Sequence, residues 1–124
     1  MQRSIRRIRH LDNILRGATT NGNVTTYAAD VYEDCSSREP EEGALMLIDL
    51  ESDVSIQLKA IETGQENIRR EVGIADPIWK EATIIRERYA RALGYFEDMR
   101  QWAEKGKLKA RFKRHQLLFQ QCTD

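Results

Sequence analysis

The most informative part of the chain, from Asp76 to Lys105, reads DPIWKEATIIRERYARALGYFEDMRQWAEK. Its apolar residues recur in alternating steps of four and three, and they are Ile78, Ala82, Ile85, Tyr89, Ala92, Phe96, Met99 and Ala103. A seven-residue apolar repeat sustained in this way is typical of a long helix that packs along another helix. Asp76 suits the N-cap and Pro77 the first helical position. The pattern therefore predicts a helix over 77–105.

A second long stripe precedes this one and predicts a helix over about 41–72. Its members, Gln65 being the only polar one, are Leu47, Leu50, Val54, Leu58, Ile61, Gln65, Ile68 and Val72. Gly73 suits the left-handed residue that ends a helix. Because the link to Pro77 is short, the two long helices are expected to lie antiparallel. Gly64 is a candidate point for a bend or an interruption, and Gly94 for the close approach of a neighbouring backbone.

The two ends of the chain predict shorter helices. A helix over 3–18 is predicted by one apolar stripe, whose members are Ile5, Ile8, Leu11, Leu15 and Ala18. After Gly106 the apolar residues no longer follow the seven-residue repeat, which predicts a separate or kinked helix over 107–121. The segment 19–35 is ambiguous. Asn21-Gly22 is a turn signal that would make 24–27 the arm of a β-hairpin, whereas the residues from Tyr27 to Cys35 favour a short helix.

These elements predict an all-α fold in a single domain, 1–124, built on a long antiparallel helical hairpin with shorter N- and C-terminal helices. Two long helices cannot bury all of the apolar residues that flank their stripes, which are Leu45, Ile48, Ile56, Trp79, Ile84, Leu93, Tyr95 and Trp102. The shorter helices supply some cover and a second subunit would supply more. We therefore expect a bundle-like protein that forms a homodimer.

Composition narrows the class of protein. The chain has 124 residues and a formal net charge of zero. Its longest apolar run, 44–48, is far shorter than the roughly 20 residues that a membrane span requires, so no membrane association is expected. Cys35 and Cys122 are too few and too distant for a disulfide framework, which favours free thiols in the cytoplasm. The Arg-rich start also fits a mitochondrial presequence, but an ordinary first helix is the favoured interpretation.

The neutral total conceals a division of charge along the chain. Residues 1–29 carry a charge of +4, residues 30–66 carry −9, residues 67–104 are balanced, and residues 105–124 carry +5. One interpretation is that the basic ends fold against, or dimerise onto, the acidic segment. A second is that the basic ends bind nucleic acid, since clustered cations neutralise phosphates. A third is that the acidic segment docks on a basic partner protein.

Motifs for catalysis or cofactor binding are missing from the sequence. It contains no Glu-x-x-His pair for a di-metal site, no close Cys/His spacing for zinc and no glycine-rich phosphate loop. The acid pairs Asp49/Asp53 and Glu62/Glu66, four residues apart, fit a solvated helix face better than acid–base chemistry. We therefore expect no enzyme activity, no metal and no cofactor.

The function expected is that of a non-enzymatic interaction module, an adaptor, regulator or inhibitor that binds a protein partner through surface and charge complementarity. Its candidate interface residues are Glu41, Glu42, Asp49, Asp53 and whichever of Trp79 and Trp102 is exposed, since tryptophan dominates interface energetics. The alternative is a nucleic-acid-binding regulatory protein. That function would use the basic residues of the two terminal helices, Arg6, Arg7, Arg9, Lys109, Lys113 and Arg114.

Overall fold

The structure, a computed structural model, describes residues 2–19 and 23–106. The regular secondary structure of this part of the chain is entirely α-helical and consists of the helices α1 (Gln2–Ala18), α2 (Val24–Ser37), α3 (Pro40–Val72) and α4 (Pro77–Glu104). The all-α, bundle-like fold class is thereby confirmed. The expected helix over 107–121 lies outside the described residues.

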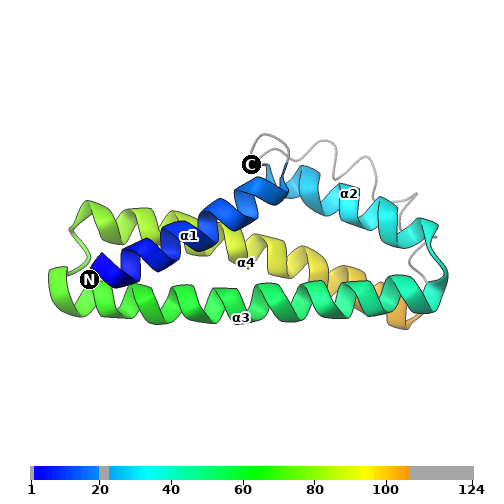
Figure 1. Ribbon diagram of the computed structural model, residues 1–124. Helices are drawn as coiled ribbons and strands as arrows, with labels where there is room; N and C mark the ends of the chain where they lie inside the picture. The colour runs from blue at the N-terminus through cyan, green and yellow to red at the C-terminus, as the bar shows by residue number, and fades with distance from the viewer. Residues whose placement is uncertain (1, 20–22, 107–124) are drawn as a thin grey trace.

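The helices α3 and α4 run side by side in opposite directions, while α1 and α2 follow one another along the same side of that pair (Figure 1). The half of the pair near the turn at 73–76 is covered by α1, and the other half by α2. Gly73 ends α3 with a φ of 81°, a left-handed conformation that favours glycine. Asp76 caps α4, since its carboxylate accepts a hydrogen bond from the backbone N–H of Ile78 at 2.8 Å.

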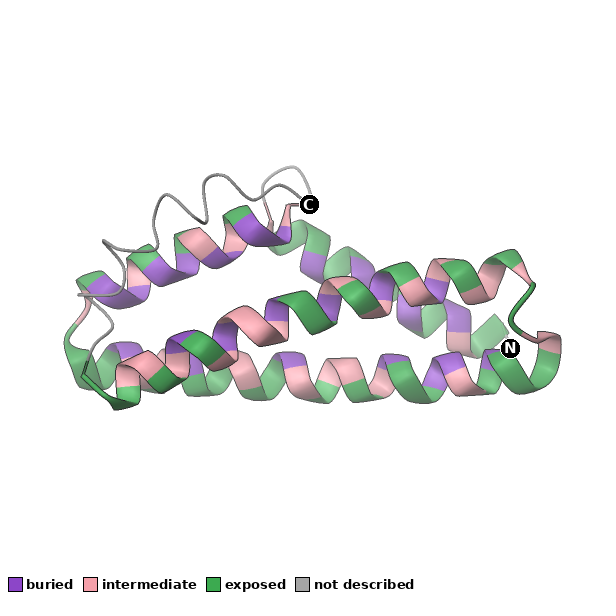
Figure 2. Cartoon of the chain, turned by 180° about the vertical axis from the view of Figure 1, so that it is seen from behind, coloured by how far each residue is buried: buried purple, intermediate pink, exposed green. Residues whose placement is uncertain are grey.

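The predicted apolar stripes form the core between these layers (Figure 2). Leu47, Val54, Ile61 and Ile68 of α3 are buried against a row in α4 whose members are Ala82, Ile85, Tyr89, Ala92, Phe96 and Met99. Gln65, the polar member of the α3 stripe, is also buried. Its amide donates to the Thr83 hydroxyl at 2.6 Å, which satisfies the polar group inside the bundle.

A second row on α4, also spaced by seven residues, holds α1 and α2 in place. Each member contacts one partner on the covering helices, in the pairs Glu81–Arg9, Arg88–Asp12, Tyr95–Thr25 and Trp102–Tyr32. The row begins with ion pairs over α1 and ends with hydroxyl and ring contacts over α2. The heptad of α4 therefore positions both neighbouring layers of the bundle.

The ambiguous segment 19–35 does not form the hairpin arm that Asn21-Gly22 suggested. Residues 24–27 are the first turn of α2, because the Asn23 side chain accepts a hydrogen bond from the N–H of Thr26 at 3.0 Å. Val24 is fully buried and Thr25 nearly so, and the Thr25 hydroxyl lies 2.9 Å from that of Tyr95. Helical geometry alone brings these two adjacent residues into the core.

Two expectations about glycine are wrong. Gly64 does not interrupt α3, which is continuous from Pro40 to Val72. Gly94 is not a point of close approach, since a Cβ there would meet no atom within 4 Å. The close approaches lie at Gly43, where a Cβ would be 2.6 Å from the carbonyl oxygen of Cys35, and at Gly64, where it would be 3.0 Å from Cδ1 of Ile8. These glycines let α2 and α1 approach α3.

Candidate functional site

The half of α3 nearer its N-terminus carries large apolar residues on the side opposite the core. Leu45, Ile48 and Ile56 are exposed by 59%, 42% and 65%. With Ser52 they are spaced by three or four residues, so they form one stripe along the helix. These are flanking residues that sequence analysis could not assign to a buried position. An exposed apolar patch of this kind is typical of a protein-interaction site.

Carboxylates follow this stripe on its flank. Glu42, Asp49 and Asp53 are exposed and separated by seven and four residues, which places them on one side of the helix. We call the surface formed by Leu45, Ile48, Ile56 and these carboxylates the α3 outer face. Among the described residues, Glu42 has an ion pair with Arg38 at 3.6 Å, and no ion pair involves Asp49 or Asp53.

The repulsion between Asp49 and Asp53 has no compensation within the described ranges 2–19 and 23–106. Like charges four residues apart on a helix cost about 0.2–0.5 kcal/mol, so this pair does not serve the stability of α3. Glu41 differs, because it is exposed in the first turn of α3, where the helix dipole favours a negative charge. Asp49 and Asp53 are therefore the stronger candidates for a binding role.

A shallow groove adjoins the stripe on the side that faces α4. It is lined by Ile48, Glu51, Ser52, Ser55, Ile56 and Arg100, and two of these residues, Arg100 and Glu51, form an ion pair. The guanidinium of Arg100 also bonds to Glu104 at 2.9 Å. Arg100 is thus held by two carboxylates, and the groove has a fixed polar floor beside two exposed apolar side chains.

The two tryptophans are half-buried and pack against the core, so neither is an exposed anchor. The ring of Trp102 lies 5.4 Å from that of Tyr32, at an interplanar angle of 41°. Trp79 lies in the first turn of α4 and accepts, through its carbonyl, a hydrogen bond from Thr83 at 3.0 Å. The large exposed apolar residues of the described chain are instead aliphatic, and three of the six, Leu45, Ile48 and Ile56, lie on α3.

The basic residues of α1 have divided roles. Arg9 is engaged within the bundle, since its guanidinium donates to both carboxylate oxygens of Glu81 at 2.6 and 2.8 Å. This contact lowers the pKa of Glu81 below its ordinary value. Arg6 and Arg7 are exposed and have no ion pair in the described part of the chain. Lys109, Lys113 and Arg114 lie outside the described residues.

The ion pairs of α1 do not reach the acidic segment 30–66. Arg9 pairs with Glu81, and Arg16 lies 3.8 Å from Asp12, whose other partner is Arg88. Asp12 is buried, although a charged residue outside the apolar stripe of α1 is not expected in the core. In the described residues, the arginines of α1 therefore do not neutralise the acidic segment, and Asp49 and Asp53 of that segment are exposed on α3.

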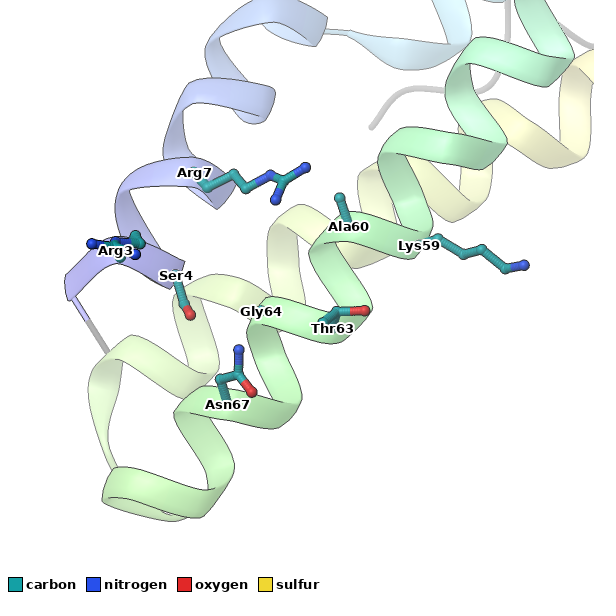
Figure 3. Close-up of a pocket in the computed structure, with 8 residues that line it drawn as sticks. All are labelled: Arg3, Ser4, Arg7, Lys59, Ala60, Thr63, Gly64 and Asn67. Carbon is teal, nitrogen blue, oxygen red and sulfur yellow. The ribbon is translucent and has the colours of Figure 1, made fainter.

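Beside α1, a second groove has a different character (Figure 3). It has a volume of about 370 Å³ and is lined by Arg3, Ser4, Arg7, Lys59, Ala60, Thr63, Gly64 and Asn67. None of these residues is acidic. Arg7 is the one member of this set proposed from the sequence as a binding residue. The others could not be found from local pattern, because residues of α1 and α3 that are more than fifty positions apart come together through the packing of the two helices, with Ile8 on Gly64.

Comparison of the chain with protein-family models, curated proteins and solved structures gives no match. No helix in the described part of the chain combines the length and apolar character that crossing a membrane requires.

Proposed function

We propose that this protein is a non-enzymatic interaction module, an adaptor, regulator or inhibitor, that binds a protein partner through the α3 outer face. The observation that carries the proposal is the exposure of Leu45, Ile48 and Ile56 along one helix beside two carboxylates, Asp49 and Asp53, that have no ion pair in the described residues. Burial of apolar surface supplies the affinity, and the carboxylates supply the choice of partner and the rate of association.

The partner that suits this face is a helix with an apolar stripe bordered by lysine or arginine. A straight helix of 33 residues offers a partner helix a long line of contact. Aliphatic residues of the partner would cover Leu45, Ile48 and Ile56, and its cations would face Asp49 and Asp53. Charge complementarity of this kind mainly raises the association rate, so binding is expected to weaken with salt without being lost.

Homodimerisation remains a second part of the proposal. A dimer formed through the α3 outer face would bring together two surfaces that both carry the exposed carboxylates Asp49 and Asp53, and juxtaposed like charges disfavour such an interface. A dimer is therefore expected to use other apolar residues, and Ile84 of α4, exposed by 54%, offers such a position. Size-exclusion chromatography with light scattering on the wild type and on Ile84→Asp tests this: the variant should be monomeric if Ile84 lies in the interface.

The test of the main proposal is affinity capture from the native host with three forms of the full chain. These are the wild type, Asp49→Lys/Asp53→Lys and the control Asp30→Lys/Asp98→Lys, which makes the same change of charge at exposed sites on α2 and α4. The proposal expects one stoichiometric protein with the wild type and the control, and its loss with the first variant. Equal recovery with all three forms would contradict it.

The same eluates test the alternative function. A nucleic-acid-binding protein would yield material with a high ratio of absorbance at 260 nm to that at 280 nm, removed by high salt and without a stoichiometric protein. Its binding would survive Asp49→Lys/Asp53→Lys and would be lost on reversal of Lys109 and Lys113. In support of this alternative, Arg6 and Arg7 are exposed, whereas Arg9 is already paired with Glu81.

A further inference from the structure

We propose that the groove between α1 and α3 is a binding site for a compact phosphorylated ligand, such as a phosphate ester or a diphosphate. This site is separate from the α3 outer face and does not depend on the function proposed for that face. It combines cationic, hydroxyl and amide groups from two helices around a floor formed by Ala60 and Gly64.

The two walls of the groove, formed by α1 and α3, each carry a row of polar side chains. Arg3 and Arg7 are four residues apart, as are Lys59, Thr63 and Asn67, so each set lies along one side of its helix. In Figure 3 the Arg7 side chain extends from α1 toward α3, and the Ser4 and Asn67 side chains point toward each other beside Gly64, whereas Lys59 points away from α1 at the rim. A ligand in the groove would therefore meet donors from both sides.

Gly64 makes this arrangement possible. Ile8 packs so closely on it that a Cβ would lie 3.0 Å from Cδ1 of Ile8 and 3.7 Å from Cβ of Ser4. The first turns of α1 are thereby held against α3, and the Arg3 and Arg7 positions are fixed relative to Asn67. A site whose backbone is fixed in advance loses less ordering free energy when it binds.

The cations of this groove are available to a ligand. Arg3, Arg7 and Lys59 are exposed, and no ion pair holds any of them within the described ranges 2–19 and 23–106. Glu62 follows Lys59 on α3 but does not line the groove, and Glu66 is engaged by Arg69 at 2.5 Å. Positive charge is therefore concentrated in the groove without a carboxylate to neutralise it there.

The chemistry of the donors favours phosphate over carboxylate. The guanidinium groups of Arg3 and Arg7, the Ser4 hydroxyl and the Asn67 amide, with Lys59 at the rim, offer more donors than the two oxygens of a carboxylate can accept, whereas phosphate offers more oxygens and a greater charge. Guanidinium groups bind phosphate through paired, charge-assisted hydrogen bonds. The volume of about 370 Å³ lies in the range of small-molecule sites and leaves room for more than one inorganic ion.

The extent of the positive surface favours a compact ligand over a nucleic-acid strand. Beyond Arg7 on α1, Arg9 is held by Glu81 and Arg16 is near Asp12. Among the described residues, the cations of α1 without an ion pair therefore end at Arg7, while a strand gains its affinity by neutralising many phosphates in succession. One or two phosphate groups match the available cations.

The test is a titration of the full chain with inorganic pyrophosphate, followed by amide chemical shifts in NMR spectra. We expect saturable shifts at Ser4, Gly64 and Asn67, and a dissociation constant that rises with salt. Arg7→Ala should weaken binding by about three- to tenfold, because it removes a charge-assisted hydrogen bond at an exposed site. Arg6→Ala is the matched control: Arg6 is its exposed neighbour outside the groove, and its loss should change binding less than twofold.

A second variant changes the groove without removing a cation. Asn67→Asp introduces a carboxylate of almost the same shape and should abolish the shifts, while Asn13→Asp, on an exposed part of α1, should not. Equal losses for Arg6→Ala and Arg7→Ala, or shifts confined to 107–124, would overturn the proposal, as would the absence of saturable binding. Tighter binding of a single-stranded oligonucleotide than of pyrophosphate or a mononucleotide would overturn the compact-ligand assignment.

Discussion

The close packing of α2 on α3 at Gly43 predicts that a larger residue at this position lowers the stability of the fold. In Gly43→Ala the new methyl group would lie 2.6 Å from the carbonyl oxygen of Cys35 and 3.4 Å from its carbonyl carbon. These are backbone atoms, and the same oxygen accepts the N–H of Arg38 that ends α2. The overlap can therefore be relieved only by moving the end of α2 away from α3.

The expected change in the free energy of unfolding is the difference between two opposing contributions. Alanine is favoured over glycine in a helix by about 0.5–1 kcal/mol, and overpacking of a closely packed site costs about 1–3 kcal/mol. Gly43→Ala is therefore expected to lower the free energy of unfolding by up to roughly 2.5 kcal/mol, because the difference of these ranges runs from about 0 to 2.5 kcal/mol. Gly94→Ala is the matched control, since a methyl group there meets nothing within 4 Å, and it should raise the stability by about 0.5–1 kcal/mol.

Urea denaturation followed by far-UV circular dichroism measures both variants. Because the helix propensity is common to the two, their difference in unfolding free energy isolates the contact with Cys35, and it should be about 1–3 kcal/mol. That difference corresponds to roughly 0.5–1.5 M in the urea midpoint for a chain of this size. If both variants move the midpoint in the same direction by the same amount, the close approach of α2 to Gly43 is wrong.

Three further predictions concern the core and its ion pairs. Burial raises the pKa of the Cys35 thiol from 9.0 to about 11, so the thiol ionises at a lower pH in the unfolded chain than in the folded one. The free energy of unfolding should therefore fall by about 2–3 kcal/mol as the pH rises from 9 to 11. Urea denaturation at several pH values measures this loss, and Cys35→Ala should reduce it. Tyr89→Phe removes the hydrogen bond from its hydroxyl to the Leu11 carbonyl at 2.5 Å, and a loss of about 1–2 kcal/mol in urea denaturation is expected, whereas unchanged stability would contradict that contact. Arg9 holds the pKa of the Glu81 carboxyl below its ordinary value. The pair therefore stabilises the fold above the pKa that Glu81 has in the unfolded chain, and this contribution is lost as the pH falls through the lower pKa of the folded state. An NMR titration of the Glu81 carboxyl should show the lowered pKa, and Glu81→Gln should abolish this loss of stability at acid pH.

The sequence was sufficient to predict the long helices because their periodicity is strong and their boundaries are chemically marked. The buried row of α4 matches the seven-residue repeat, and Asp76 and Gly73 mark the turn as their residue types suggested. Gln65 was recognised as the polar member of the α3 stripe, but its partner Thr83 depends on the alignment of α3 against α4. Local pattern fixes each helix, whereas contacts between helices require their relative positions.

The segment 19–35 shows why local signals alone are ambiguous. Asn21-Gly22 fits a hairpin turn, yet Asn23 two residues later also fits a helix cap, and propensity does not choose between them. The choice depends on Val24 and Thr25, which are both buried against the hairpin of α3 and α4 and could not both face it in a strand. Tertiary burial therefore selects the helix.

The two candidate surfaces lie on different halves of α3 and are opposite in charge. Asp49 and Thr63 are fourteen residues apart, which is about 20 Å along the helix, while charges at physiological ionic strength are screened over about 8 Å. The carboxylates of the α3 outer face therefore exert little influence on an anion bound beside Gly64, whereas Lys59, at the rim of the groove, lies only three residues from Ile56. The two proposals nevertheless rest on different residues, so neither supports the other: loss of the protein partner leaves phosphate binding to be decided by Arg7 and Asn67, and absence of phosphate binding leaves the docking face to be decided by Asp49.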